Sequence, residues 1–268
     1  MALLDNMFDL TGKAAVVTGG GSGIGEATSL VLAEAGAAVV VADINEDAAQ
    51  ATAKQIVEQG GKAVALRTDV QLRADHDAAV DLAVAQFGSA DVYCNIAGIP
   101  CDAPVSDISE AELDRMIGIN LKGVLFGCQA AFRVMKAQGT GGNIVNVSST
   151  GIDVTDLGNG IYGMTKAGVA MLSMFLATEG GPSGIRVNSI APGATITAFS
   201  ARHKYDADGN VDEAKWEQFV EGMRSAGPLH MVGEAIDQAM LILYLVSPAA
   251  RFATGNIFRV NGGQSMAW

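Results

Sequence analysis

The sequence has few of the residues that build metal centres and disulfide frameworks. It contains 3 Cys and 3 His in 268 residues, and Cys94, Cys101 and Cys128 show no Cys-x-x-Cys spacing. Zinc sites need paired ligands at short spacing, and small secreted domains usually depend on several disulfides. We therefore expect no metal site, no disulfide framework, and a reducing, cytoplasmic location.

Basic residues and long apolar runs are also scarce. Lys and Arg total 17 against 29 Asp and Glu, a net charge of −12, which is the wrong sign for attraction to a phosphate backbone. No uninterrupted apolar run reaches the roughly 18–20 residues that a membrane-spanning helix needs. Residues 1–13 carry acids where a signal peptide carries a basic segment. The sequence therefore predicts no nucleic-acid partner, no membrane span and no secretion signal.

Short runs rich in Val, Ile and Ala alternate with stretches of helical period. Strands that are apolar on both faces and separated by amphipathic helices indicate a parallel sheet covered on both sides. We expect one α/β domain over residues 1–268, a doubly wound parallel sheet of about seven strands with helices on both faces. The expected strands are Ala14–Thr18, Ala37–Ala42, Ala63–Thr68, Val92–Asn95, Asn143–Ser148, Arg186–Ala191 and Ile257–Val260.

A glycine-rich segment, residues 18–25 (TGGGSGIG), follows the first strand and leads into a helix expected to begin near Ile24. Glycine here permits a tight turn and close approach of the backbone to a pyrophosphate, and the helix N-terminus supplies free N–H donors. The second strand ends at Asp43, an acid that can accept hydrogen bonds from an adenosine ribose. Together these features predict a dinucleotide site rather than the alternative, a glycine-rich turn beside an incidental acid.

Neither the glycine turn nor the segment after Asp43 holds an Arg or Lys that could bind the 2′-phosphate of NADP. The expected cofactor is therefore NAD.

Tyr162 and Lys166 form a Tyr-x-x-x-Lys pair, which lies on one face if the segment is helical. An ammonium about 5 Å from a phenol is worth roughly 3 kcal/mol at an effective dielectric near 20, or about two pH units off the tyrosine pKa. Such a tyrosine could act as a general acid or base near neutral pH. Ser149, at the end of a predicted strand, could hold a substrate oxygen opposite the phenol or serve only as a turn hydroxyl.

With these motifs in order along nearly the whole chain, the sequence resembles the classical short-chain dehydrogenase/reductase family, which has a Rossmann-type fold. The residues that carry the resemblance are Thr18, Gly19, Gly23, Ile24 and Gly25 (TGxxxGxG); Asp69 and Val70; Asn95, Ile96, Ala97 and Gly98 (NNAG); Asn120; Ser149, Tyr162 and Lys166; and Pro192, Gly193 and Thr197 (PG-x-x-x-T). Three positions depart from the family pattern, Cys94, Thr165 and Asn261, and none of them removes a catalytic group.

The resemblance implies reversible hydride transfer between a nicotinamide and the carbinol carbon of a secondary alcohol, giving a ketone. Asn120, Ser149, Tyr162 and Lys166 are its implied catalytic residues: Tyr162 moves the hydroxyl proton, Lys166 holds the nicotinamide ribose, Ser149 orients the substrate oxygen and Asn120 fixes a water of a proton relay. The implied cofactor-binding residues are Gly19, Ser22, Gly23, Ile24, Gly25, Asp43, Asp69, Val70, Asn95, Ala97, Gly98, Tyr162, Lys166, Pro192, Gly193, Thr195 and Thr197.

Two alternatives stay open. A 3-oxoacyl-thioester reductase would use the same residues, and a non-catalytic NAD-binding sensor or scaffold would need only the fold.

The least regular segment, residues 198–227, is expected to be a lid over the substrate, or else an ordinary surface excursion. We expect Ile99, Pro100, Ile152, Asp153 and Val154 to line the pocket with it, and its Phe199, Trp216 and Phe219 indicate an apolar alcohol or ketone.

A homotetramer is implied by the resemblance. The helices expected around 107–135 and 160–178 are the candidate interfaces, with Leu125, Phe126, Ala130 and Val134 at helical spacing on the first.

Overall fold

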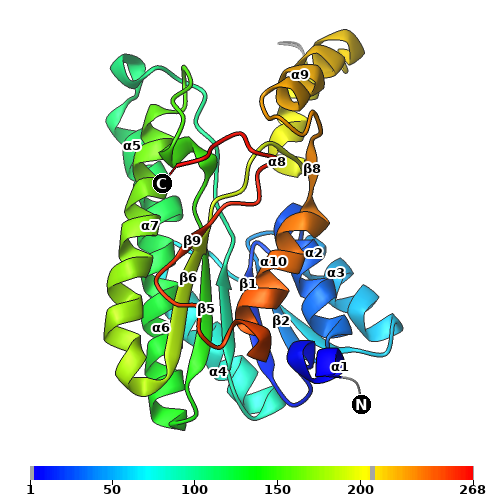
Figure 1. The fold of residues 1–268 in the computed structure, drawn as a ribbon, viewed down its shortest axis with the longest axis vertical. Helices are drawn as coiled ribbons and strands as arrows, with labels where there is room; N and C mark the ends of the chain where they lie inside the picture. The colour runs from blue at the N-terminus through cyan, green and yellow to red at the C-terminus, as the bar shows by residue number, and fades with distance from the viewer. Residues whose placement is uncertain (1–2, 206–208, 268) are drawn as a thin grey trace.

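The protein is described here from a computed structural model that covers residues 3–205 and 209–267. Its centre is a parallel sheet of seven strands in the order β3-β2-β1-β4-β5-β6-β9 (Figure 1). The strands are β1 (Ala14–Thr18), β2 (Ala38–Asp43), β3 (Lys62–Arg67), β4 (Val92–Asn95), β5 (Gly142–Val147), β6 (Ile185–Ile190) and β9 (Ile257–Phe258); β7 (Thr195–Ile196) and β8 (Gly233–Glu234) pair separately. The predicted Rossmann-type fold is confirmed.

Helices cover both faces of this sheet (Figure 1). One face carries α2 (Gly23–Glu34), α3 (Glu46–Glu58) and α10 (Ala235–Val246), and the other carries α4 (Arg73–Phe87), α6 (Gly123–Gln138) and α7 (Gly160–Gly180). The remaining helices are α1 (Leu3–Phe8), α5 (Glu110–Ile117), α8 (Ala198–Ala201) and α9 (Glu213–Ser225). The short turns are η1 (Val105–Asp107), η2 (Gly118–Lys122), η3 (Thr150–Ile152), η4 (Gly181–Ser183), η5 (Arg202–Lys204) and η6 (Pro248–Ala250).

The central strands are buried on both faces, as their unbroken apolar runs predicted. Every residue of β1 and β4 is buried, and their side chains alternate between two separate cores. Val17 belongs to the core under α2 and α10, whereas Val16 belongs to the core under α4 and α6. Because both faces are covered, the polar groups that follow the strands collect at the carboxyl edge of the sheet.

The strand order reverses between β1 and β4, which leaves a crevice at their carboxyl ends. Thr18, the last residue of β1, fastens the two turns that border this crevice. Its hydroxyl donates to the Cys94 carbonyl at 3.2 Å and accepts from the amides of Ile96 and Ala97 at 3.1 and 3.4 Å.

Two segments differ from the sequence expectation. β9 ends at Phe258 rather than Val260, and the side chain of the next residue, Arg259, binds Asp153. Residues 160–183 form a helical stretch apolar and long enough to pass as a membrane span by length and composition. Its buried face packs on β5 and β6, however, as a core helix does.

Candidate active site

A single cavity of about 1040 Å³ runs along the carboxyl edge of the sheet. At one end, called here the glycine-turn end, lie residues 19–25, Asp43 and Asp69. At the other, the lid end, lie Leu157 and residues of the 198–227 segment. The predicted site residues that line it are Gly19, Ser22, Gly23, Ile24, Gly25, Asp43, Asp69, Val70, Ala97, Gly98, Ser149, Tyr162, Lys166, Pro192, Gly193, Thr195 and Thr197. The fold therefore brings most of these residues to one cavity.

The glycine turn passes directly from β1 into α2, which begins at Gly23, next to the predicted start. A Cβ on Gly25 would lie 1.9 Å from the Gly19 carbonyl oxygen, so no larger residue fits there. Gly19 and Gly23 both have positive φ, +70° and +53°. Glycine is thus required by backbone contact and by conformation, and the turn leaves the α2 N-terminus open to the cavity.

Asp43 is partly exposed at the end of β2 and holds the glycine turn in place. Its Oδ2 accepts from the Gly21 amide at 3.0 Å and its Oδ1 from the Asn45 amide at 2.9 Å. A carboxylate has about four acceptor positions, so two remain for a ribose hydroxyl. The neighbouring Ile44 is 55% exposed and also lines the cavity.

Ser149, Tyr162 and Lys166 are brought together by two links between the end of β5 and helix α7. The Ser148 hydroxyl donates to the Lys166 carbonyl, and the Lys166 ammonium donates to the Val147 carbonyl, both at 2.8 Å. These bonds fix the helix against the strand end that carries Ser149. The Ser149 hydroxyl acts to lower the pKa of the Tyr162 phenol, and it accepts from the Gly151 amide at 3.0 Å, so its turn role is present as well.

The charge balance at this trio differs from the sequence expectation that Lys166 lowers the pKa of Tyr162. Burial raises the pKa of Tyr162, while the Ser149 hydrogen bond and the Arg202 charge oppose that rise. Burial also lowers the pKa of Lys166 to about 8. The lysine Nζ lies 5.6 Å from the centre of the tyrosine ring. Because burial disfavours both charged forms, the simple Coulomb estimate is wrong here.

Asn95 and Asn120 do not line the cavity. Asn95 is buried beneath it, where its Nδ2 donates to Asn146 Oδ1 at 2.8 Å. Asn120 is fully buried in η2, a single π-helical turn. Its Oδ1 accepts from the Ile99 amide at 2.8 Å and its Nδ2 donates to the Ile99 carbonyl at 2.9 Å. Its contribution in this structure is to fix the backbone that follows Gly98.

Several expected pocket residues lie elsewhere. Ile99 lines the cavity, but Pro100, Ile152, Asp153 and Val154 do not. The Asp153 carboxylate turns to the C-terminal segment, where it accepts two bonds from Arg259, at 2.7 and 3.0 Å, and one from the Ser265 hydroxyl at 2.6 Å. The side chain is therefore committed to an ion pair that sequence spacing could not reveal.

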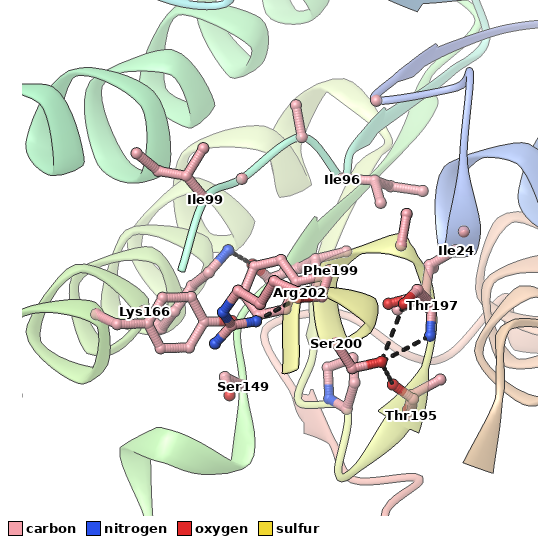
Figure 2. Close-up of a pocket in the computed structure, with 18 of the residues that line it drawn as sticks. Ile24, Ile96, Ile99, Ser149, Lys166, Thr195, Thr197, Phe199, Ser200 and Arg202 are labelled. Atoms are coloured by element: carbon pink, nitrogen blue, oxygen red, sulfur yellow. Dashed lines mark hydrogen bonds between the residues drawn. The ribbon is translucent and has the colours of Figure 1, made fainter. Parts of the chain in front are cut away.

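The segment after Pro192 and Gly193 closes one side of the cavity. The Ser200 hydroxyl donates to the carbonyls of Thr195 and Thr197 and accepts from the Thr197 amide, as the dashed lines in Figure 2 show. Gln264, which the sequence analysis missed, accepts from the Ala194 amide at 2.6 Å and fixes the same segment from the C-terminal side. Arg202 and Asp102 were missed as well; both line the lid end and pair with each other.

The chain is similar to known dehydrogenases in sequence and in structure. A family profile described as short chain dehydrogenase matches residues 13–208. The chain is 38% identical to a cis-4-hydroxycyclohexanecarboxylate dehydrogenase of Sinomonas cyclohexanicum, over 94% of this chain and 96% of that protein. It is 35% identical to 3beta-hydroxysteroid dehydrogenase 1 of Eggerthella lenta, over 96% and 95% of the two chains.

Among solved structures, a 7 alpha-hydroxysteroid dehydrogenase complexed with NADH and 7-oxo glycochenodeoxycholic acid superposes with a TM-score of 0.87. It is 32% identical and covers 100% of both chains. The protein belongs to the short-chain dehydrogenase/reductase family and is an oxidoreductase acting on CH–OH groups.

Proposed function

We propose that this protein interconverts a secondary alcohol and a ketone with NAD(H), using Tyr162 as the general acid and base. The observation that carries the proposal is the Ser149, Tyr162 and Lys166 trio on the wall of a cavity whose other end is the glycine turn. A proton-transfer group and a pyrophosphate cradle in one cavity fit hydride transfer better than binding alone, which disfavours a sensor or scaffold.

The residues at the glycine-turn end fit a dinucleotide. The turn has no room for a Cβ on Gly25, the N-terminus of α2 offers free amides to a pyrophosphate, and Asp43 keeps acceptor capacity for the adenosine ribose. Asp69 and Val70 line the same end. When bound, the nicotinamide would supply or accept the hydride, which is chemistry that no side chain can perform.

The side chains supply positioning and proton transfer. The Tyr162 phenol gives its proton to the ketone oxygen in reduction and takes it from the hydroxyl in oxidation. The Ser149 hydroxyl orients that oxygen, and Lys166 faces the nicotinamide ribose. Asn120 is assigned an indirect part, because its amide is committed to Ile99 and fixes the backbone next to the reacting groups.

The proposed substrate is an apolar, cyclic secondary alcohol or its ketone. Leu157, Phe199, Phe219 and Met223 line the lid end of the cavity, and such apolar side chains favour contact with apolar ligands. The relatives named above act on hydroxycyclohexanecarboxylate and hydroxysteroids. The 198–227 segment is proposed as the lid; its residues 206–208 lie outside the described part of the chain.

A 3-oxoacyl-thioester reductase remains the second candidate function, because it would use the same trio. Neither the glycine turn nor the segment directly after Asp43 holds a basic residue, which argues against it, since that group usually uses NADPH. Comparing kcat/KM for a 3-oxoacyl thioester and a cyclic ketone, each with NADH and NADPH, separates the two.

We also propose a homotetramer, with α7, one of the two segments expected to form interfaces, and α10 as its interface helices. Ala130 and Val134 are in the core, so they cannot form a contact between subunits. Helix α7 instead exposes Met171 and Phe175, 54% and 64% exposed, and α10 exposes Met240. Apolar side chains of this size exposed in a row on one helix are typical of a subunit interface.

The test of the proposed function is Tyr162→Phe. The substitution removes one hydroxyl and little volume, so we expect a loss of turnover of at least about 10³-fold with NAD affinity within a few fold of wild type. Initial rates from NADH absorbance give turnover and fluorescence titration gives affinity. Tyr244→Phe, at an exposed tyrosine of α10, is the matched control and should keep full activity. A Tyr162→Phe variant with near-wild-type rate would refute the assignment.

A further inference from the structure

Arg202 connects the 198–227 segment to the loop after β4. Its guanidinium makes a two-point ion pair with Asp102, Nε to Oδ2 and Nη2 to Oδ1, both at 2.8 Å. The third nitrogen, Nη1, donates to the Phe199 carbonyl. Since all three nitrogens of the planar group have acceptors, its position and orientation are set.

The same guanidinium belongs to a stack of side chains that ends at the catalytic phenol. Its Cζ lies 5.0 Å from the centre of the Phe199 ring, and the Phe199 ring centre lies 5.9 Å from that of Tyr162. Figure 2 shows Phe199 and Arg202 together between the Ser149 and Lys166 side of the cavity and the Thr195 and Thr197 side. The ion pair therefore holds an aromatic ring and a cation on the inner side of the lid end.

The two charges of the pair are not equivalent toward the cavity. The Asp102 side chain is 57% exposed and that of Arg202 is 31% exposed. Water screens the carboxylate more than the guanidinium, so the pair presents a net positive potential to the cavity. In agreement with this, the charge of Arg202 lowers the pKa of Tyr162.

We propose that Arg202 is a positioning residue for proton transfer: clamped by Asp102, it holds Phe199 against Tyr162 and keeps a cation beside the phenol that favours the phenolate. The proposal rests on the proposed role of Tyr162 as proton donor and acceptor. In this proposal the Asp102 carboxylate partly screens the Arg202 charge, and so sets the electrostatic effect of Arg202 on the Tyr162 phenol.

Other charged and titratable groups line the cavity with the phenol. Lys166 lies on its own helix, His203 follows Arg202 in η5, and Arg115 of α5 and Asp156 of the loop before α7 line the same cavity. Burial lowers the pKa of His203, with the Arg202 charge acting in the same direction. Variants must therefore change one charge at a time.

The test is the pH dependence of kcat/KM for alcohol oxidation in four variants. Arg202→Gln removes the cation, and we expect the acidic limb of the profile, where protonation of Tyr162 stops oxidation, to move up by about 0.5–1 pH unit. Asp102→Asn keeps the cation and removes its screening partner, so this limb should move down or stay. Arg202→Lys keeps the charge without the two-point pair and should restore the wild-type limb with a lower kcat. Lys204→Gln removes a cation of the same turn that pairs with Glu213 outside the cavity, and should change nothing.

A purely structural role for the ion pair gives a different result, because Arg202→Gln and Asp102→Asn would then lower activity alike. Equal shifts in these two variants, or a limb within 0.2 unit of wild type in Arg202→Gln, overturn the proposal. A ¹³C titration of tyrosine-labelled protein, with Tyr162→Phe to assign the signal, measures the same shift without turnover. The Arg202 proposal can thus fail while Tyr162 remains essential, whereas failure of the proposed function appears as a Tyr162→Phe variant with near-wild-type rate.

Discussion

The preference for NAD over NADP is expected to depend on the charge of Asp43. A 2′-phosphate bound at the ribose position would lie about 4 Å from this carboxylate, where two unit charges repel by about 1 kcal/mol in water and about 4 kcal/mol at an effective dielectric of 20. Asp43 is partly exposed, so a value between these limits applies. We expect kcat/KM to favour NADH by at least about a hundredfold, which corresponds to roughly 2.7 kcal/mol.

Two variants separate repulsion from structure. Asp43→Asn keeps an oxygen acceptor for the Gly21 or Asn45 amide but carries no charge, so it should raise efficiency with NADPH and leave efficiency with NADH within about tenfold. Asp43→Ala combined with Ile44→Arg adds a cation at a side chain that is exposed on the cavity rim. This double variant should erode or reverse the preference.

The assay is the initial rate of reduction of one ketone with NADH and with NADPH, at fixed and low ionic strength because salt screens the repulsion. Added salt should narrow the wild-type preference. Comparable wild-type efficiencies with the two cofactors would show that Asp43 does not face the ribose. An Asp43→Asn variant that stays selective would show that its charge is not the cause.

Three further outcomes are expected. Lys166→Met should lower both turnover and NAD affinity. Because burial lowers the pKa of Lys166 in the folded protein to about 8, the free energy of unfolding of the wild type, measured in urea, should rise relative to this variant by about 1.36 kcal/mol per pH unit between pH 8 and 10.5. A difference that stays constant over this range would contradict the lowered pKa. Gly25→Ala should cost about 2 kcal/mol or more of folding stability because its Cβ meets the Gly19 carbonyl, whereas Gly181→Ala, with open space around it, should be nearly neutral. Sedimentation at micromolar concentration should give a tetramer that Phe175→Glu dissociates, and a wild-type monomer would exclude the proposed assembly.

The sheet was predictable from the sequence because strands buried on both faces appear as unbroken runs of apolar residues. A strand such as β1 has no polar residue until Thr18, and the glycines that follow are dictated by backbone contacts only a few residues apart. Such short-range constraints are visible in a single sequence. The position of Ser149 follows from them, because parallel strands end at the same edge of the sheet, and Tyr162 lies on the helix that comes next in the chain.

Side-chain orientation was less predictable. Asp153 follows Ser149 closely enough to suggest a place in the pocket, yet it pairs with Arg259, which is 106 residues distant. Arg202 and Asp102 are 100 residues apart. The sequence around these four residues contains no local pattern that identifies which residue each one pairs with. Periodicity and spacing therefore cannot predict ion pairs between distant loops. Asn120 was found by its motif, but its bonds to Ile99 depend on the π-helical turn that bears it.

The proton affinities at the site depended on burial, which the sequence does not specify. An exposed lysine beside an exposed tyrosine would lower the tyrosine pKa, as the Coulomb estimate assumed. In the folded protein burial penalises the phenolate and the ammonium alike, so the pKa of Tyr162 rises while that of Lys166 falls to about 8. Burial therefore favours the protonated phenol over the phenolate. The protonated phenol can donate a proton to a ketone, whereas oxidation of an alcohol needs the phenolate, so each added cation lowers the pH at which the phenolate forms. We therefore expect the charge of Arg202, which pairs with Asp102, to affect the pH at which alcohol oxidation becomes efficient.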